Sequence, residues 1–185
     1  MAFLYNIGIQ AYHLAIQLAA PFNEKAALLC KGRKEVWKKA AGIQRGEGRL
    51  VWFHAASLGE FEQGRPVIEA LKAAEPATQI LLTFFSPSGY EIRKNYTGAD
   101  YILYLPGDTR RNAVRLIEKF RPDAAVFIKY EFWFHYLNEL NKRNIPVYLI
   151  SAIFRPNQPF FKSWGKLHRR MLGCFKQFLS DCWPL

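Results

Sequence analysis

The chain has 185 residues, half of them hydrophobic and 16% aromatic, which suits one folded domain with its own core and excludes a disordered protein. Lys and Arg number 26 against 15 Asp and Glu, so a net charge of +11 attracts polyanions: nucleic acid, anionic lipid or a phosphorylated substrate. Composition alone does not choose among these partners. The three cysteines and four histidines lack the spacing of a disulfide framework or a metal cluster, and we expect no metal site.

Residues 2–22, AFLYNIGIQAYHLAIQLAAPF, contain no charged residue and predict a first helix. Asn6, Gln10, His13 and Gln17 fall on one face of that helix and leave a broad apolar arc. A basic tract follows: Lys25, Lys31, Arg33, Lys34, Lys38 and Lys39. This combination favours a segment that lies in the membrane interface, although the same helix could instead pack on the domain's own core. Its length would allow a membrane span, but its four polar residues argue against one.

From residue 50 onward, short apolar runs alternate with helical stretches. The predicted strands are 50–56, 79–85, 101–105, 123–129 and 146–152. The predicted helices are 61–74, 88–96, 109–120 and 131–143, and a last amphipathic segment covers 160–178. Such alternation predicts a parallel sheet covered on both faces. The expected fold is a Rossmann-like three-layer α/β domain over 41–178, behind a helical extension over 1–40 and ahead of an atypical tail over 179–185.

Polar residues gather where these strands end, at the edge of a parallel sheet where ligands bind. They form five short segments: ASLGE (56–60), SPSGYE (86–91), LPGDTRR (105–111), KYEFW (129–133) and SAIFRPNQ (151–158). Each segment alone would suit a helix cap or a turn. Five polar loops on one edge predict a binding cleft.

Glu60 fits two roles that the local pattern does not separate. Ser57-Leu58-Gly59-Glu60 is the S-x-x-E pattern of a capping box, in which the hydroxyl and the carboxylate accept from free N–H groups at a helix start. The same glutamate follows a hydrophobic strand, where catalytic groups of α/β proteins collect.

HAASLGE, SPSGYE, KYEFW and the apolar first helix with its basic tract together resemble the amino-terminal half of 3-deoxy-D-manno-octulosonic acid (Kdo) transferases. These are the glycosyltransferases of lipopolysaccharide inner-core assembly, and the resemblance reaches to about Phe178. It implies a GT-B-type enzyme whose amino-terminal domain holds the acceptor and whose carboxy-terminal domain holds CMP-Kdo. The implied partners are a lipid A precursor, CMP-Kdo and the anionic cytoplasmic face of the bacterial inner membrane, with no cofactor and no nucleic acid.

By this resemblance Glu60 is the general base. It would take a proton from an acceptor sugar hydroxyl, whose oxygen attacks the anomeric carbon of Kdo while CMP leaves with inversion. The two roles compete only in part, because a residue in the first helical turn is positioned by the helix in either case. We favour the base over the cap alone. The substrate-binding residues expected from the same loops are Ser57, Gly59, Ser86, Ser88, Gly89 and Arg155.

The chain departs from the family pattern at two places. The family commonly has E-x-E before the tryptophan after the fourth strand, whereas this chain has Lys129-Tyr130-Glu131. We expect Glu131 and Lys129 to share in catalysis, the lysine by stabilising donor charge; alternatively Glu131 is a first-turn acid favourable to the helix dipole. The chain also stops at Leu185, with the tail LSDCWPL, so we expect a fragment that lacks the donor domain.

Three other functions remain as alternatives. A non-catalytic remnant that binds glycolipid or anionic membrane would keep the same site without the chemistry. A nucleic-acid-binding domain is disfavoured because the aromatic residues fall in predicted strands and in the first helix rather than among the basic residues. A dinucleotide or P-loop site is disfavoured because ASLGEFEQG lacks both glycine patterns.

Overall fold

The structure is a computed structural model that describes residues 2–179. Within them, six parallel strands form one sheet in the order β3-β2-β1-β4-β5-β6. The strands are β1 (Leu50–Ala55), β2 (Gln79–Phe84), β3 (Tyr101–Tyr104), β4 (Ala124–Ile128), β5 (Val147–Ile150) and β6 (Gln177–Leu179). The helices are α1 (Ala2–Ala19), α2 (Glu24–Gly42), α3 (Leu58–Ala74), α4 (Pro87–Arg93), α5 (Arg110–Phe120), α6 (Phe134–Lys142) and α7 (Lys166–Leu172), with a 3₁₀ turn η1 (Pro159–Phe161).

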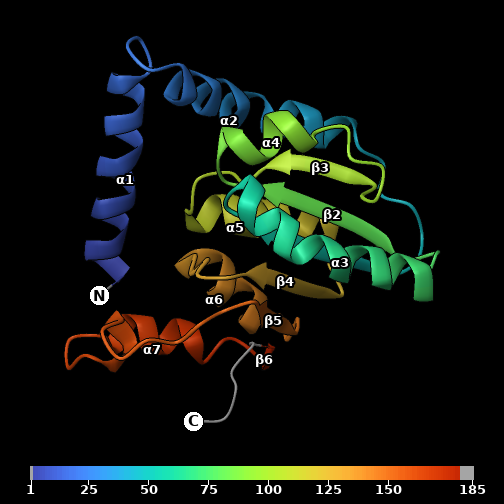
Figure 1. Cartoon of the computed structure of the whole chain (residues 1–185). Helices are drawn as coiled ribbons and strands as arrows, with labels where there is room; N and C mark the ends of the chain where they lie inside the picture. Colours follow the sequence, from blue (N-terminus) through green and yellow to red (C-terminus); the bar gives the residue numbers. More distant parts are fainter. Residues whose placement is uncertain (1, 180–185) are drawn as a thin grey trace.

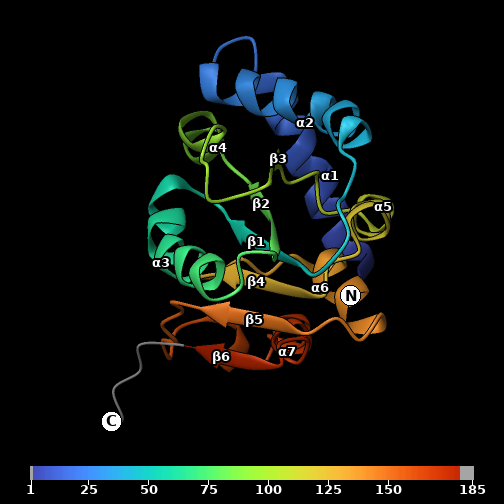
Figure 2. The same cartoon turned by 90° about the vertical axis from the view of Figure 1, so that its right-hand side faces the viewer.

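The sheet is the middle of three layers. Figure 2 shows α3 and α4 on one face of it, α5, α6 and α7 on the other, and α2 over the β3 edge. Every residue of β1, β2 and β4 is buried, which explains why these strands read as continuous apolar runs rather than as alternating ones. Two apolar cores follow, one on each face, with Trp52 and Phe127 in the first and Phe53 and Phe84 in the second. The predicted Rossmann-like α/β fold is confirmed.

Side-chain caps fix where the helices begin. Asn23 Oδ1 accepts from the Ala26 N–H at 3.1 Å at the start of α2. Thr109 Oγ1 accepts from the Asn112 N–H at 3.2 Å at the start of α5. Each satisfies a backbone donor that a helix end leaves without an intrahelical partner.

Helix α1 runs along the edge where the strands end, beside the tips of β2 and β3 (Figure 1). The Tyr5 ring packs against Phe134 at the start of α6, with ring centroids 5.4 Å apart. The Tyr12 ring stacks on Phe85, just after β2, at 6.0 Å. A side chain on Gly107, after β3, would collide with the His13 ring, so glycine permits this close approach. The extension is therefore part of the edge where ligands are expected.

Helix α1 turns part of its polar face toward the domain, where Tyr5 and Ile16 also pack against the two cores. Asn6 Oδ1 lies 2.6 Å from His135 Nε2, and His13 and Gln17 line a pocket against the rest of the domain. On the outer side, exposed apolar residues are Phe3, Leu4, Ile7, Leu14 and Leu18. No helix in residues 2–179 is both long and apolar enough to cross a membrane.

Three boundaries differ from the sequence prediction. The segment expected to be one amphipathic stretch over 160–178 is instead η1, α7 and the edge strand β6. Leu179, assigned to the atypical tail, ends β6, and the rest of that tail lies outside the described residues. The predicted helix over 131–143 begins only at Phe134, so the interpretation of Glu131 as a first-turn acid is wrong. β6 was missed because three exposed residues carry no burial pattern.

Candidate functional site

The strand order reverses between β1 and β4. In open α/β sheets the loops that follow two such strands diverge, and ligands bind in the crevice between them. One of these loops leads into α3, whose first turn carries Glu60. The other leads into α6 and carries Lys129 and Glu131. The sheet therefore places the three expected catalytic residues at its topological switch point.

Glu60 is both a capping residue and a perturbed acid. Its N–H is oriented to Ser57 Oγ, which caps α3, at 3.4 Å, and its carboxylate accepts from the Ala56 N–H at 2.6 Å. The reciprocal contact thus goes to the residue before the cap rather than to the cap itself. Burial raises the pKa of the Glu60 carboxyl and the Glu131 carboxylate raises it further, whereas the Ala56 N–H, His54 and Lys129 lower it.

Glu131 is held by two ring nitrogens. Its Oε2 accepts from Trp133 Nε1–H at 2.7 Å and lies 3.2 Å from His54 Nε2. His54, fully buried at the end of β1, places Nδ1 3.1 Å from the Thr83 carbonyl oxygen. Nδ1 also lies 2.9 Å from the Thr83 hydroxyl oxygen, and Trp133 Nε1 lies 3.0 Å from His54 Nε2. Burial and hydrogen bonds thus fix the carboxylate beside Glu60.

Strained backbone marks the same edge. Lys129 has φ of 63° and Ser151 has φ of 56°, left-handed values that non-glycine residues rarely adopt. The Lys129 N–H donates to the Ile150 carbonyl at 2.8 Å, which ties the turn after β4 to the end of β5. Such strain costs of order 1–3 kcal/mol and collects at functional sites. Here it turns the chain so that Glu131 returns toward His54.

The two serine-containing turns adjoin each other. The Ser86 N–H donates to the Ala56 carbonyl at 2.8 Å, which brings the turn after β2 beside the turn after β1. Ser86 does not cap α4 with its side chain; its hydroxyl lies 2.8 Å from that of Ser88. Two hydroxyls and the Ser57 cap therefore lie on adjoining turns at this edge.

The two glycines and the arginine differ in their surroundings. Gly59 is exposed with open space around it, so a ligand could approach its backbone. Gly89 is buried, and a side chain there would collide with Phe84. Arg155 is exposed in the loop after β5, where its N–H donates to Gln158 Oε1 at 2.7 Å. Within residues 2–179, no hydrogen bond or ion pair joins the Arg155 side chain to Glu60 or Glu131.

An aromatic stack connects this edge to α1. The Phe85 ring lies between Tyr12, at 6.0 Å, and Trp133, at 4.6 Å, and both pairs are close to parallel. Helix α1 is thereby connected through two ring contacts to the tryptophan that holds Glu131. The extension and the carboxylate pair are thus joined by a chain of ring contacts.

Sequence reasoning missed His54 and Trp133 as members of the site. A histidine at the end of a fully apolar strand was the available signal, because a buried polar side chain requires partners. Its partner Glu131 lies 77 residues away in sequence, which no local pattern reveals. Within residues 2–179, no group of three or more His, Cys, Asp or Glu side chains is arranged to hold a metal ion.

Comparison with known proteins assigns a family to this arrangement. Residues 30–181 match the family profile described as 3-deoxy-D-manno-octulosonic-acid transferase (kdotransferase). The 3-deoxy-D-manno-octulosonic acid transferase of Chlamydia trachomatis is 30% identical over 122 residues, which cover 63% of this chain and 28% of the relative. The enzyme of the same name from Aquifex aeolicus is 36% identical over 84 residues, which cover 45% of this chain and 23% of the relative. The chain thus spans less than a third of these relatives.

Solved structures with a similar fold are much more distant in sequence. MurG of Acinetobacter baumannii superposes with a TM-score of 0.53 at 11% identity, over 75% of this chain and 43% of that one. A UDP-N-acetylglucosamine 2-epimerase gives a TM-score of 0.51 at 17% identity, over 72% of this chain and 42% of that one. At these identities the likeness shows the fold alone: one Rossmann-like half of a GT-B-type architecture.

Proposed function

The chain belongs to the 3-deoxy-D-manno-octulosonic-acid transferase family, and from that premise we propose that it is the acceptor-binding part of a glycosyltransferase. The reaction transfers Kdo from CMP-Kdo to a lipid A precursor. Glu60 takes the proton of an acceptor hydroxyl, the freed oxygen bonds to the anomeric carbon, and CMP leaves with its bonding electron pair and with inversion. The observation that carries this proposal is the pair Glu60 and Glu131 at the switch point of the sheet.

The environment of Glu60 suits a base. A raised pKa makes a carboxylate a better proton acceptor, and a general base typically contributes about 10²–10⁴-fold in rate. Helix positioning and proton transfer are compatible, because Glu60 uses only Oε2 in the bond to Ala56. Lys129, close enough to lower the pKa of Glu60, is positioned to stabilise donor charge.

The acceptor is a phosphorylated glycolipid at the cytoplasmic face of the inner membrane. The exposed apolar side of α1 lies along the same edge as Glu60, so a lipid anchored in the bilayer could present its sugars there. Arg155 and the 86–91 loop line the glycolipid site, because guanidinium binds phosphate and the serines supply hydroxyls. Micelles of a lipid A precursor should therefore bind the chain better than equally charged phospholipid does.

The decisive test substitutes Glu60 by Gln in a polypeptide in which this chain is followed by a CMP-Kdo-binding domain. Glutamine can still accept from the Ala56 N–H but takes no proton, so transfer should fall by about 10²–10⁴-fold with an unchanged melting temperature. Glu69→Gln, on the same helix and paired with Arg65, is the matched control and should keep full activity.

Three outcomes separate the possible roles of Glu60. Near-normal turnover would leave Glu60 as a cap only and move the base to Glu131 or Glu91. A lower melting temperature with a parallel loss of turnover would make the defect structural. Glycolipid binding without transfer by the unsubstituted protein would identify the non-catalytic remnant instead.

A further inference from the structure

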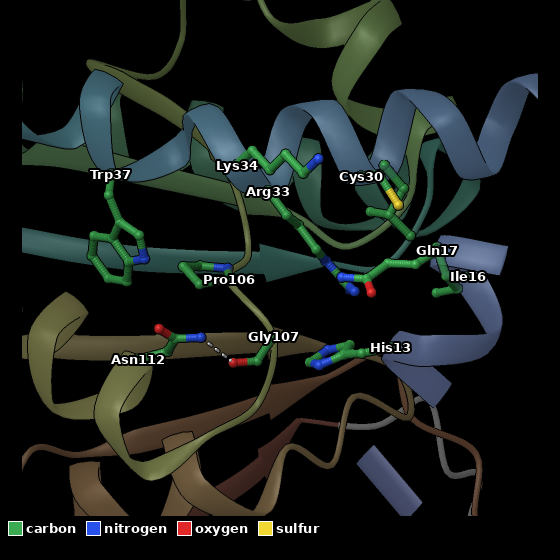
Figure 3. Close-up of a pocket in the computed structure, with 11 residues that line it drawn as sticks. His13, Ile16, Gln17, Cys30, Arg33, Lys34, Trp37, Pro106, Gly107 and Asn112 are labelled. Atoms are coloured by element: carbon green, nitrogen blue, oxygen red, sulfur yellow. Dashed lines mark hydrogen bonds between the residues drawn. The ribbon is translucent and has the colours of Figure 1, made fainter. Parts of the chain in front are cut away.

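A small cavity lies where α1, α2 and the loop after β3 meet. Its volume is about 210 Å³, roughly seven times the ~30 Å³ that a water molecule occupies in the liquid. In Figure 3, Arg33 and Trp37 project from α2 into this space, with His13 of α1 and the Pro106–Gly107 turn opposite. The cavity is thus large enough for one polar headgroup and lies outside the Glu60 crevice.

Arg33 is a half-buried cation with no carboxylate among the residues that line the cavity. Its Nε and Nη2 atoms are inaccessible to solvent and have no hydrogen-bond partner among the described residues. Burial lowers the pKa of the guanidinium, which the Tyr12 hydroxyl partly offsets, yet an arginine side chain stays protonated in proteins. The residues that line the cavity include no Asp or Glu. A charge whose atoms are buried in this way ordinarily requires a counter-charge.

One face of the Arg33 guanidinium packs against an aromatic ring at the border of the cavity. The guanidinium lies over the Phe85 ring, with Cζ 4.6 Å from the ring centroid, so a cation–π contact occupies one of its faces. Lys34, the next residue on α2, lines the same cavity and has an exposed side chain. Two adjacent cations match the charge of a phosphomonoester better than that of a single carboxylate.

The other polar groups of the cavity fit the same ligand. Burial and the nearby Arg33 lower the pKa of His13, which favours the neutral imidazole at neutral pH and leaves a ring N–H able to donate. Asn112 donates its side-chain amide to the Gly107 carbonyl at 2.8 Å, which holds that turn against the cavity. The site therefore combines one half-buried cation, one exposed cation and a neutral donor.

We propose that this cavity binds a phosphomonoester group, with Arg33 as the half-buried anchor and Lys34 at the entrance. The cavity is connected to the Glu60 crevice through Phe85, which touches both the Arg33 guanidinium and the Trp133 ring. A ligand that fills both places would present a phosphate to Arg33 and a sugar hydroxyl to Glu60. The assignment of that phosphate to the glycolipid acceptor rests on the proposed function, whereas phosphate binding itself does not.

The test measures binding of glucose 6-phosphate to the 185-residue chain by calorimetry at constant ionic strength, with glucose as the uncharged control. We expect saturable binding of the phosphate ester and none of glucose. Arg33→Gln should weaken binding by about tenfold or more, because it removes charged hydrogen bonds. Arg111→Gln, which removes an exposed arginine of α5 outside the cavity, should change affinity less than about twofold.

The melting temperature of the variant provides an independent test of the site. Without ligand, Arg33→Gln should melt no lower than the unsubstituted chain, since it removes a half-buried charge that no carboxylate of the cavity compensates. If that variant fails to fold, Lys34→Gln decides instead, because its exposed side chain leaves the fold intact and its loss should still weaken binding severalfold. If Arg33→Gln and Arg111→Gln weaken the binding of glucose 6-phosphate equally, or if binding does not saturate, the proposed site is wrong. The phosphate would then bind to a diffuse cationic surface.

A competition experiment identifies the source of the phosphate. Micelles of a phosphorylated lipid A precursor should displace glucose 6-phosphate, whereas phosphatidylcholine vesicles that contain phosphatidic acid should not. Equal displacement by both would overturn the glycolipid assignment in favour of a phospholipid headgroup. Because the readout is binding, it does not depend on whether Glu60→Gln abolishes transfer.

Discussion

The carboxyl of Glu60 is subject to opposing influences whose balance is a raised pKa. A group whose folded pKa lies above its unfolded value contributes stability that is fully present below the unfolded pKa and is lost as pH rises through the folded pKa. At neutral pH the ionised Glu60 therefore opposes folding slightly. A perturbed carboxyl of this kind beside an intact cap marks a candidate functional group rather than a stabilising one.

Glu131 offers a test of this balance. Its carboxylate is the second-largest cause of the raised Glu60 pKa, so Glu131→Gln should lower that pKa. Because the base acts only when deprotonated, the acid limb of the kcat/KM profile should move to lower pH, whatever happens to the maximal rate. The measurement is the pH profile of the complete enzyme, with Glu69→Gln as the control. An acid limb that stays in place would show that Glu131 does not act on the base.

At the scale of elements, Asp108 joins three segments that sequence patterns treat separately. It lies in the loop after β3, and its carboxylate accepts from the N–H groups of His135 and Tyr136 at 3.1 and 3.2 Å. These are donors of the first turn of α6, whose own N-cap residue, Trp133, supplies no side-chain cap. The Tyr5 hydroxyl of α1 donates to the same carboxylate. One buried acid therefore connects α1 and α6 with the edge of the sheet.

Asp108→Ala should lower the free energy of unfolding by about 1–3 kcal/mol, because it leaves buried donors without a partner. Hydrogen exchange in α1 should rise more than in β1, since Tyr5 loses its acceptor while the sheet is untouched. Denaturant unfolding measures the first effect. Glu47→Ala removes an exposed carboxylate and should change neither quantity. An unchanged unfolding free energy for Asp108→Ala would mean that water replaces the carboxylate at no cost.

The outer face of α1 gives a prediction about membranes. Phe3, Leu4 and Leu18 are 73%, 72% and 66% exposed, so their replacement by serine should leave the melting temperature unchanged. Insertion of such side chains into the interface is worth about 1.5–3 kcal/mol each, so the triple variant should bind anionic vesicles more than tenfold more weakly. Val67→Ser together with Ile92→Ser, exposed apolar residues away from α1, is the control. Co-sedimentation that matches the unsubstituted chain would contradict membrane contact by α1.

At the scale of the whole molecule, local patterns were sufficient for the layers but not for the site. Apolar runs located the first five strands because these are buried on both faces or nearly so, and S-x-x-E located the start of α3. The contact of His54 with Glu131, the position of α1 along the strand ends and the burial of Arg33 depend on residues far apart in sequence. Such long-range contacts leave no periodic trace. Strand β6 was not predicted because it is short and exposed.

The distribution of charge over the whole chain separates the remaining alternatives. The large aromatic residues of the strands, among them Trp52, Phe53, Phe84 and Phe127, are buried and offer no surface on which bases could stack. A net charge of +11 would bind nucleic acid through its phosphates, a contact that salt weakens. The apolar face of α1 does not depend on salt in this way.

Raising salt from about 50 mM to about 200 mM should therefore reduce binding of single-stranded DNA by orders of magnitude. Binding to anionic vesicles should fall only in part, to a residual level set by the apolar face of α1. The Phe3, Leu4 and Leu18 serine variant should lose that residual level and keep the salt-sensitive share, which makes it the internal control. If vesicle binding vanished with salt as completely as DNA binding does, the surface would be a nonspecific polycation. The chain would then lack the membrane contact that brings a glycolipid to Glu60.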